Sequence, residues 1–560
     1  MFIETTSKPR HSLKHRLTLR LRLNNRPIDT QIKCIFYKRR ISGFRIPGTG
    51  FQITCQWNLD CGFQSLGLRI PRVKILRFAV LITLHGANER TLIECFLNTS
   101  LSLLDPDYLA ITDDGPAGMT NVKKPGGTLS RAIGDGKTDD SSAIEAIINQ
   151  AAGSTINKVF FPPGEYLVGR NIIIRHSVEL HGTKLGIAVI KAPRNRSMKI
   201  YIDATSVKSV ALNNLYLDGV LVEFNGRQKT NDVKLFNCLF FSVFSRLSPK
   251  PANKYNPQLK MKELSNADVN MCIFLKDSKA FGVATEFTRT SNVTVRYNVF
   301  GLDLSKINWL STELKPAKHW QDQTEKLRFL TTRYNLTSDQ GFFKSCLYDE
   351  CDKEMKIRKN VFNGSPNTGA LKKDHVVYLK GFNGMVFEQN YARGWSADPT
   401  GGIKARNGKS ITIACNYIDD TGILLYSHNK TKDCLHDGLK DVVVYGNHII
   451  QRSNPGHRCS GISYYEPHFT GRDENITYLG NTFEIINRSD PTNYRCIWLT
   501  NGDVTHHHVY EDNVYYNTTT KVKLEARKGT PRYEKENIAF GTAVRNTYNF
   551  PPYKLNIPTY

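Results

Sequence analysis

Asparagine recurs at a near-constant interval through the second half of this chain, and this regularity restricts the fold more than any other feature. Each copy follows a short segment in which apolar and polar residues alternate, the pattern of a strand with one buried face. The copies are Asn237, Asn298, Asn360, Asn390, Asn416, Asn447, Asn481 and Asn513. The intervals are 61, 62, 30, 26, 31, 34 and 32 residues, so we interpret the first two as doubled units. One strand and one corner per unit, stacked in layers, predicts a β-solenoid.

Each asparagine is expected at the bend that follows its strand. A representative copy reads Ile411-Thr-Ile-Ala-Cys-Asn416-Tyr-Ile. Asparagine tolerates left-handed backbone at such a bend, and identical amides in successive layers can hydrogen-bond along the stack. A series of separate hairpins would explain the strands, but it would not explain one corner residue that returns at the same spacing.

The segment before the repeats predicts a covered end of the solenoid. It reads Ile133-Gly-Asp135-Gly136-Lys-Thr138-Asp139-Asp140-Ser, and Phe161-Pro-Pro163-Gly164-Glu-Tyr166 follows. Asp-Gly favours a turn, and Ser142 with Glu145 has the spacing of a capping box at a helix start. The apolar stripe of that helix consists of Ile144, Ile147, Ile148 and Ala151. A short amphipathic helix here would act as a lid on the core.

This opening resembles that of the pectate-lyase-like superfamily, in the group that shares the pattern GDGxTDD…FPPGxY with rhamnogalacturonases, phage tailspikes and related depolymerases. The resemblance implies an all-β fold, a right-handed parallel β-helix (solenoid) with a short N-terminal capping helix, over residues 130–520. It also implies that Asp135, Asp139 and Asp140 are structural rather than catalytic. Members include lyases, hydrolases, epimerases and non-catalytic adhesins, so the fold leaves the reaction open.

The outward face of the repeats is where we expect the functional residues. His375–Asn390 aligns with Gly401–Asn416 without a gap, which places Val377 over Ile403 and points both inward. Residues of the opposite parity then point outward in stacked columns, and the equivalent strands of other repeats extend them. The face predicted in this way presents Lys276, Tyr378, Lys380, Lys404, Arg406, Tyr426, Tyr465 and Trp498.

Cations interleaved with aromatic rings suit an acidic polysaccharide, because Arg and Lys pair with carboxylates while Tyr and Trp stack on sugar rings. They also suit β-elimination, in which cations neutralise the uronate carboxylate beside the proton that is removed. Lys404 and Arg406 would lower the pKa of Lys380 and make it a general base, and Tyr378 or His375 would protonate the leaving oxygen. The resemblance adds that lyases of this fold place a Lys and an Arg on successive coils, although a lyase's full local motif is not found around Lys380 and Arg406. Solvated surface cations remain the simpler interpretation.

Two alternatives to elimination stay open. Hydrolysis needs two suitably separated carboxylates, and the candidates are Asp398, Asp419, Asp420 and Glu466. The paired aspartates and the GHG pattern of polygalacturonases are not evident. A glycan-binding adhesin would use the same basic face without any chemistry. Replacing Lys380 would weaken the affinity of an adhesin, whereas in a lyase binding would survive and turnover would stop.

Metal ligands are weakly indicated. Several lyases of the superfamily use calcium to bind substrate carboxylates, and Asp374, Glu388 and Asp398 could contribute oxygens, although their spacing is not diagnostic. The run His506-His-His508 would alternate faces in a strand and is interpreted as a polar surface segment. We therefore expect no obligatory cofactor other than this candidate calcium.

The first 110 residues form a basic extension, with 17 Lys/Arg against 7 Asp/Glu, in a chain whose formal net charge is +25. The first 45 residues favour an unstructured extension over a nucleic-acid arm or a transit peptide, so no nucleic-acid partner is expected. Residues 72–87 have the basic flank and short apolar run of a displaced secretory signal, or of a buried strand. This run is too short to span a bilayer.

Cysteines and glycosylation acceptors favour an extracellular glycoprotein. Twelve cysteines occur without zinc-type spacing, and the pairs Cys346 with Cys351 and Cys434 with Cys459 are candidates for disulfides within insertions. Asn-X-Ser/Thr acceptors occur at Asn98, Asn195, Asn292, Asn335, Asn429, Asn475, Asn487 and Asn517. The tail, residues 521–560, is expected to pack on the last coil or to be loose.

Overall fold

The computed structural model describes residues 3–5, 14–23 and 26–37, and then residues 115–525 with gaps. The gaps are 153–156, 184–187, 196, 204–206, 242–256, 276–282, 302–344, 364–374, 394–401, 430–436, 452–460, 467–472, 486–495, 501–507 and 517–521. The chain divides into two units, Met1–Pro106 and Asp107–Tyr560. The signal-like run at 72–87 and the tail after residue 525 lie outside the described residues.

The described part of the first unit is a three-stranded antiparallel sheet. It consists of β1 (Ile3–Thr5), β2 (Lys14–Leu23) and β3 (Arg26–Tyr37), with β2 in the centre. These three strands lie within the basic extension, for which the sequence favours an unstructured segment.

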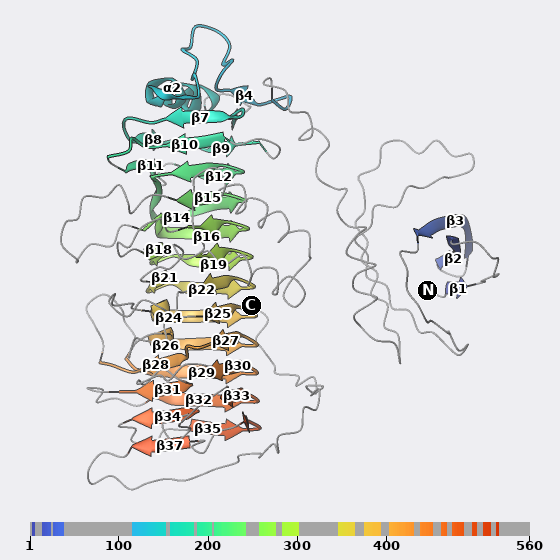
Figure 1. Ribbon diagram of the computed structural model, residues 1–560, viewed down its shortest axis with the longest axis vertical. Helices are drawn as coiled ribbons and strands as arrows, with labels where there is room; N and C mark the ends of the chain where they lie inside the picture. The colour runs from blue at the N-terminus through green and yellow to red at the C-terminus, as the bar shows by residue number, and fades with distance from the viewer. Residues whose placement is uncertain are drawn as a thin grey trace. The chain divides into compact units, whose positions relative to one another are not determined.

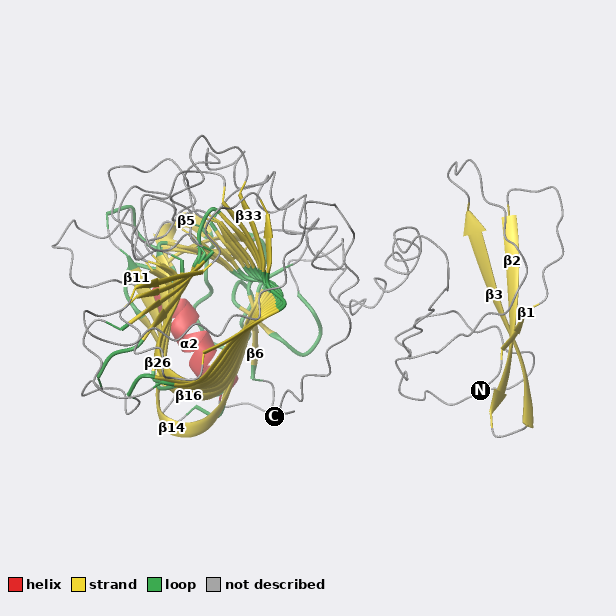
Figure 2. Ribbon diagram, turned by 90° about the horizontal axis from the view of Figure 1, so that it is seen from below, coloured by secondary structure: helices red, strands yellow, loops and turns green. Residues whose placement is uncertain are grey.

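The second unit is a coil of parallel strands that forms three walls (Figures 1 and 2). The first wall contains β8 (Ile172–Ile174), β11 (Met198–Asp203), β18 (Val283–Thr288), β21 (Ser345–Glu350), β28 (Ile423–Tyr426), β31 (Ile462–Tyr465), β34 (Ile497–Thr500) and β37 (Val522–Glu525). The second wall contains β4 (Thr120–Asn121), β6 (Lys158–Phe160), β9 (Val178–His181), β12 (Ser209–Asn213), β19 (Ser291–Arg296), β22 (Lys353–Arg358), β29 (Leu439–Tyr445), β32 (Glu474–Leu479) and β35 (His508–Glu511). Four long strands bend to run through both walls: β14 (Val220–Phe236), β16 (Leu259–Asn270), β24 (His375–Glu388) and β26 (Ile403–Ala414).

The third wall is a separate parallel sheet of 13 strands. Its strands are β5 (Asp135–Asp139), β7 (Gly164–Leu167), β10 (Ala188–Lys191), β13 (Tyr216–Asp218), β15 (Leu239–Phe241), β17 (Ile273–Phe274), β20 (Val299–Phe300), β23 (Val361–Asn363), β25 (Tyr391–Arg393), β27 (Tyr417–Asp419), β30 (His448–Gln451), β33 (Thr482–Ile485) and β36 (Val514–Tyr516). The fold class predicted from the sequence, a parallel β-helix, is confirmed.

The core is a column of apolar side chains between the walls, because the inward residue of each strand lies on the inward residue of the next coil. In the third wall Phe240, Phe274, Phe300 and Phe362 stack with successive ring centroids 4.8, 4.8 and 4.9 Å apart. All four rings are buried. Burial of a phenylalanine contributes ~1.5 to 3 kcal/mol, and each ring pair adds ~0.5 to 1.5 kcal/mol.

Seven of the eight recurring asparagines form a continuous internal ladder. The backbone N–H and the side-chain amide of Asn390 both donate to Oδ1 of Asn416, at 2.9 and 3.1 Å, and Asn360 donates to Asn390 in the same way. Nδ2 of Asn390 also donates to the carbonyl of Ile357, at 2.9 Å. The same pattern runs from Asn298 to Asn513. Stacked amides therefore fix the register of the coils.

The expected backbone role of these asparagines is wrong by one residue. The left-handed position is the residue before each ladder asparagine, for example Gln389 with φ 54° and Cys415 with φ 53°. Asn237 occupies this left-handed position itself, with φ 58°, and is not in the ladder. The buried thiols of Cys238 and Cys272 fill the ladder place in the earlier coils. A side chain that points into the core needs ordinary strand backbone, so the preceding residue makes the bend.

One of the two long asparagine intervals is not the doubled unit that the sequence predicts. Asn298 donates directly to Asn360, and Val299 pairs with Val361, so these 62 residues form one coil with a long insertion. The interval before it does hold two coils, because the corner at Met271 lies between those of Asn237 and Tyr297.

The opening motif folds into α2 (Ser141–Ala152), which lies at the end of the stack beside β7 (Figure 1). Its buried face packs against β6, β8 and β9. The Asp140 carboxylate accepts the N–H groups of Ile133 and Gly134, and Asp139 accepts those of Ser141 and Gly169. These bonds close the first coil, so the aspartates of the motif have structural partners.

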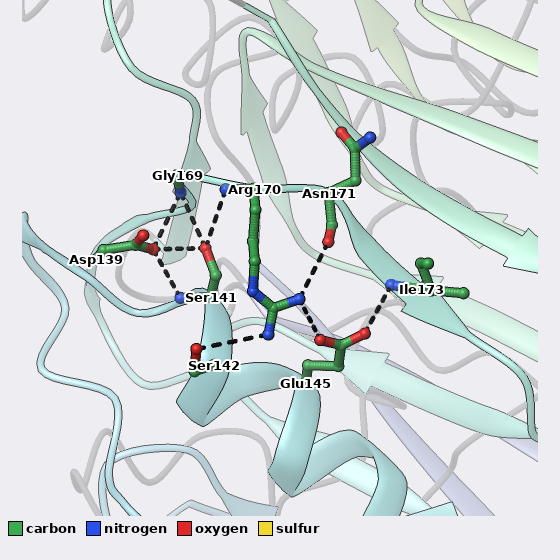
Figure 3. Close-up of polar contacts among 8 residues, drawn as sticks. All are labelled: Asp139, Ser141, Ser142, Glu145, Gly169, Arg170, Asn171 and Ile173. Carbon is green, nitrogen blue, oxygen red and sulfur yellow. Dashed lines mark hydrogen bonds and ion pairs between the residues drawn. The ribbon is translucent and has the colours of Figure 1, made fainter.

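The predicted capping box is not formed. Glu145 instead binds the Arg170 guanidinium and the N–H of Ile173, and the Ser142 hydroxyl also faces Arg170 (Figure 3). The helix therefore uses this pair to hold the next coil. Spacing along the helix could not reveal that partner, because Arg170 lies 25 residues beyond Glu145.

Candidate functional site

The outward side of the first wall carries two columns of polar and aromatic residues, set by strand register. Tyr378 lies between Tyr348 and Lys404, and Lys380 lies between Glu350 and Arg406. The second column continues through Tyr426 and Tyr465. This is the register that the alignment of the two repeats predicted for Tyr378, Lys380, Lys404 and Arg406. We call the eight residues of these two columns the first-wall cluster: Tyr348, Glu350, Tyr378, Lys380, Lys404, Arg406, Tyr426 and Tyr465.

Lys404 is held between two tyrosine rings rather than presented to solvent. Its ammonium lies 5.0 Å from the ring centroid of Tyr378 and 4.4 Å from that of Tyr426. The residue is only 9% exposed. Cation–π attraction at a desolvated site is worth ~2 kcal/mol. The predicted role of Lys404 as an exposed carboxylate ligand therefore needs correction, since its charge mainly orders the two rings.

Arg406 orients the hydroxyl of Tyr378. Nη1 of Arg406 donates to the Tyr378 oxygen at 3.2 Å, and the guanidinium lies 5.3 Å from the Tyr426 ring centroid. The Tyr378 oxygen is an acceptor in this bond, so its own proton stays available to a group above the sheet. Among the described contacts that proton has no acceptor. The hydroxyl is thus positioned to donate to a bound molecule.

Glu350 and Tyr348 are the two members of the cluster that the sequence argument missed. The Glu350 carboxylate binds the Lys380 ammonium, and the Tyr348 hydroxyl donates to it at 3.3 Å. Burial and this carboxylate raise the pKa of Tyr348. Extending the aligned register one coil back, to Ser345–Glu350, would have placed Glu350 beside Lys380.

The ion pair changes the role expected of Lys380. A general base must be neutral, and the sequence argument relied on cations alone as neighbours of Lys380. In the structure the Lys380 ammonium is instead bound by the Glu350 carboxylate, so it is the cation of an ion pair. The Lys380 side chain remains 16% exposed, so it can still reach a bound carboxylate.

Charge on the first wall is uneven along the stack. In the early coils Lys199 pairs with Glu223 at 2.7 Å and Lys260 pairs with Glu286 at 3.3 Å, so opposite charges cancel. In the first-wall cluster three cations face one carboxylate, Glu350. Net positive charge and aromatic rings therefore coincide in this cluster, and this favours an anionic ligand.

Two predicted site residues are placed differently, and a third is not described. His375 is 3% exposed, and its ring centroid lies 4.9 Å from that of Tyr378. It is therefore a buried neighbour of this tyrosine and does not line the outward face. Trp498 follows the outward parity but is 7% exposed, which removes it as an open stacking platform. Lys276 lies outside the described residues.

Tyr426 and Tyr465 form the aromatic end of the cluster. Their ring centroids are 5.6 Å apart at an interplanar angle of 52°, and the ring of His428 lies parallel to Tyr426 at 6.1 Å. Burial raises the pKa of Tyr426, so it stays a neutral phenol. Rings in this arrangement can pack against a sugar beside the charged residues.

The carboxylates considered for hydrolysis do not meet on the first wall. Asp419 lies on the third wall, where its carboxylate is 3.4 Å from the Tyr391 hydroxyl, and Asp420 accepts from Gln451. Glu466 is buried and accepts from Tyr464 at 2.8 Å. Asp398 lies outside the described residues. Separate walls leave no described pair of these candidates to flank one glycosidic bond.

The weak calcium candidates are not assembled by the described residues. Glu388 is on the second wall, 3.9 Å from the Arg358 guanidinium, while Asp374 and Asp398 lie outside the described residues. Within the part of the chain that is described, no group of three or more His, Cys, Asp or Glu side chains is arranged to hold a metal. Of the run at 506–508 only His508 is described, and its ring packs on Tyr478.

Comparisons with known proteins support the fold. Residues 120–231 match the family model described as rhamnogalacturonase A/epimerase, pectate lyase-like, which confirms the resemblance carried by the opening motif. Mannuronan C5-epimerase AlgE3 of Azotobacter vinelandii is 32% identical over 134 residues. That alignment covers 21% of this chain and 7% of the relative, so the chain spans only a small part of its length.

Similar solved structures are distant in sequence. The Streptococcus pneumoniae surface protein and adhesin PfbA is 14% identical, with a TM-score of 0.40, over 75% of this chain and 99% of that one. The A-module of Azotobacter vinelandii mannuronan C-5 epimerase AlgE4 is 15% identical, with a TM-score of 0.37, over 72% and 98%. The tailspike of Escherichia coli bacteriophage HK620, solved with a pentasaccharide, is 12% identical, with a TM-score of 0.35, over 76% and 61%.

Proposed function

We propose that this protein cleaves a uronate-containing polysaccharide by β-elimination at the first-wall cluster. The observation that carries the proposal is the Tyr378 hydroxyl, which accepts a hydrogen bond from Arg406 and keeps its own proton for a leaving oxygen. Three cations and one carboxylate surround it. The match to the rhamnogalacturonase A/epimerase, pectate lyase-like family model supports a carbohydrate substrate. Because this fold hosts several reactions, the choice of elimination is argued from the cluster itself.

The cations bind the substrate carboxylate in this proposal. Lys380 and Arg406 occupy adjacent positions on neighbouring coils, so a uronate carboxylate above them contacts both. Neutralising that carboxylate lowers the barrier to removing the proton at C5. Lys404, held between its two tyrosines, adds positive potential without direct contact.

Glu350 takes the C5 proton, and Tyr378 supplies a proton to the departing oxygen. The electron pair of the C5–H bond forms the C4–C5 double bond as the C4–O4 bond breaks, and O4 receives the Tyr378 proton. The products are an unsaturated uronate end and a new reducing end. Lys380 moves its hydrogen bond from Glu350 to the substrate carboxylate, which frees the Glu350 carboxylate to act as the base.

The test is incubation with pectate, alginate and glycosaminoglycans while following the ultraviolet absorbance of the unsaturated product together with reducing ends. Elimination produces both signals. Reducing ends without absorbance would replace this proposal with hydrolysis. Deuterium incorporation at C5 from D2O without absorbance would replace it with epimerisation.

Variants separate chemistry from binding. Tyr378→Phe keeps the ring that contacts Lys404 and removes only the hydroxyl, so turnover should fall by about 10²-fold or more while polysaccharide affinity changes little. Lys260→Met, in the neutralised early coils, is the matched control and should leave both unchanged. If Tyr378→Phe retained full turnover, the assigned acid would be wrong.

Glycan binding without chemistry is the second candidate, because the same cationic and aromatic face would serve an adhesin. An adhesin predicts that Arg406→Ala weakens affinity and that no polysaccharide yields product.

We also propose an extracellular location. It is supported by the disulfide-bonded Cys351, since disulfides persist in oxidising compartments. No described helix has the length and apolar character needed to span a bilayer.

A further inference from the structure

A single carboxylate interrupts the apolar column inside the first wall. The inward residues of successive coils are Phe224, Met261, Phe287, Asp349, Leu379, Ala405, Leu425 and Tyr464. Asp349 is 0% exposed. A buried carboxylate without a compensating partner costs several kcal/mol, so its presence between Phe287 and Leu379 needs an explanation.

A second buried carboxyl faces it. Asp352 stands at the corner that follows β21, is 0% exposed, and accepts the N–H of Thr290 through Oδ1. Both oxygens of Asp349 and Oδ2 of Asp352 are buried and make no other hydrogen bond in the described structure. The two carboxyl groups interact with each other across the corner.

Among the residues that the structure describes, none pairs a cation with either carboxyl. The ammonium of Lys380, on the neighbouring β24, is bound to Glu350 on the outward side of the wall. Glu286, on the β18 side, faces outward and pairs with Lys260. The remaining described neighbours are the backbone N–H of Lys380 beside Asp349, Thr290 beside Asp352, and the apolar column. The described side chain that acts on both members of the pair is another carboxylate, Glu350, and it raises the pKa of each.

We propose that Asp349 and Asp352 are a proton-binding site in which one shared proton links the two carboxyls and holds this coil closed. Two adjacent carboxylates in a dry interior cannot both be ionised, and a proton between them forms the missing hydrogen bond. Burial, followed by the facing carboxylate, raises the pKa of Asp349, and burial raises the pKa of Asp352.

The sign of the pH effect follows from these directions. Both groups bind protons more tightly in the folded state, so the unfolded chain releases them first as the pH rises. Stability from this pair is therefore greatest below the ordinary aspartate pKa of 3.8, and it is lost as the pH rises through the elevated folded values. The coil is stabilised in acid and loosened towards neutral pH.

The same strand carries the outward cluster. β21 holds Tyr348 and Glu350 outward and Asp349 inward, and the next residue, Cys351, is disulfide-bonded. Loosening of this strand at higher pH would shift Glu350 relative to Lys380. The buried pair binds its proton in the same way whether or not the cluster is catalytic.

The test compares the wild-type protein with Asp349→Asn, which keeps size and removes the charge. Thermal unfolding between pH 4 and pH 7.5 should show a fall in Tm for the wild type and a flatter profile for Asp349→Asn, with a higher Tm for the variant at pH 7.5. Asp232→Asn, at an exposed surface pair, is the control and should follow the wild type. Amide exchange rates of β21 and β26, corrected for the intrinsic pH dependence, give a local measurement. In the wild type the rate of β21 should rise with pH relative to that of β26, and in Asp349→Asn it should not.

Two results would overturn the proposal. One is an unchanged pH profile in a folded Asp349→Asn protein, which would show that no proton is bound there. The other is a wild-type Tm at pH 7.5 that falls with EDTA and rises with calcium chloride, with neither effect in Asp349→Asn. That outcome would identify a cation, rather than a proton, between the carboxyls.

Discussion

Replacing Asn390 with alanine should destabilise the coil far more than changing its neighbour Gln389, although the two residues share one corner. The Asn390 side chain accepts two bonds from Asn360 and donates one each to Asn416 and Ile357. All of these groups are buried. The four bonds are worth ~1 kcal/mol each, and the buried N–H of Asn360 left without an acceptor adds ~1 kcal/mol or more, so the expected loss is ~5 kcal/mol.

Gln389 provides the matched comparison. It holds the left-handed backbone at φ 54°, where glycine is favoured by ~1 kcal/mol over other residues. Gln389→Gly should therefore be neutral or stabilising, whereas Asn390→Ala should lower the urea midpoint strongly. Circular dichroism during urea unfolding, with amide exchange of β23, β25 and β27 to localise the effect, measures both.

The reasoning fails if the two substitutions have similar effects. Equal losses would mean that the corner, and not the amide ladder, holds the coils in register. A large loss in Gln389→Gly with little in Asn390→Ala would show that the Gln389 side chain, and not the buried amide of Asn390, stabilises this corner.

Substitutions at three further positions test other parts of the structure. Lys404→Met should lower the free energy of unfolding by ~1 to 2 kcal/mol, because its cation lies between two rings, and urea unfolding in high and low salt checks the electrostatic origin. Phe300→Ala should lower it by ~3 to 5 kcal/mol, while Phe300→Leu should cost less than ~1.5 kcal/mol, as measured by the same unfolding curves. Glu145→Gln should cost less than ~1 kcal/mol, because Arg170 is half exposed, yet it should raise amide exchange at Ile173, whose N–H donates to that carboxylate.

The repeat period and the alternation of the strands were readable without coordinates, because both follow from local geometry. A residue that returns every coil must occupy the same corner, and alternate residues of a strand must face opposite sides. This is why the register of Lys380 with Arg406 and of Tyr378 with Lys404 could be predicted from two aligned repeats. The helix Ser141–Ala152 followed from its apolar stripe in the same way.

Several details of the site could not follow from local pattern. Glu350 meets Lys380 across a coil boundary, and the two residues are 30 positions apart in the sequence. Parity assigned Trp498 and Lys404 to the outward face, but neighbouring side chains bury both. Outward direction is a property of one strand, whereas exposure depends on everything packed above it.

The sequence by itself determined that this chain winds into stacked coils with asparagines aligned from one coil to the next, since periodic spacing and alternation are local facts. Only the tertiary structure decided which charges meet: the carboxylate beside Lys380, the rings around Lys404, and the two buried acids behind them. Coulombic and hydrogen-bond energies depend on distance through space and on burial, and neither is encoded in separation along the chain.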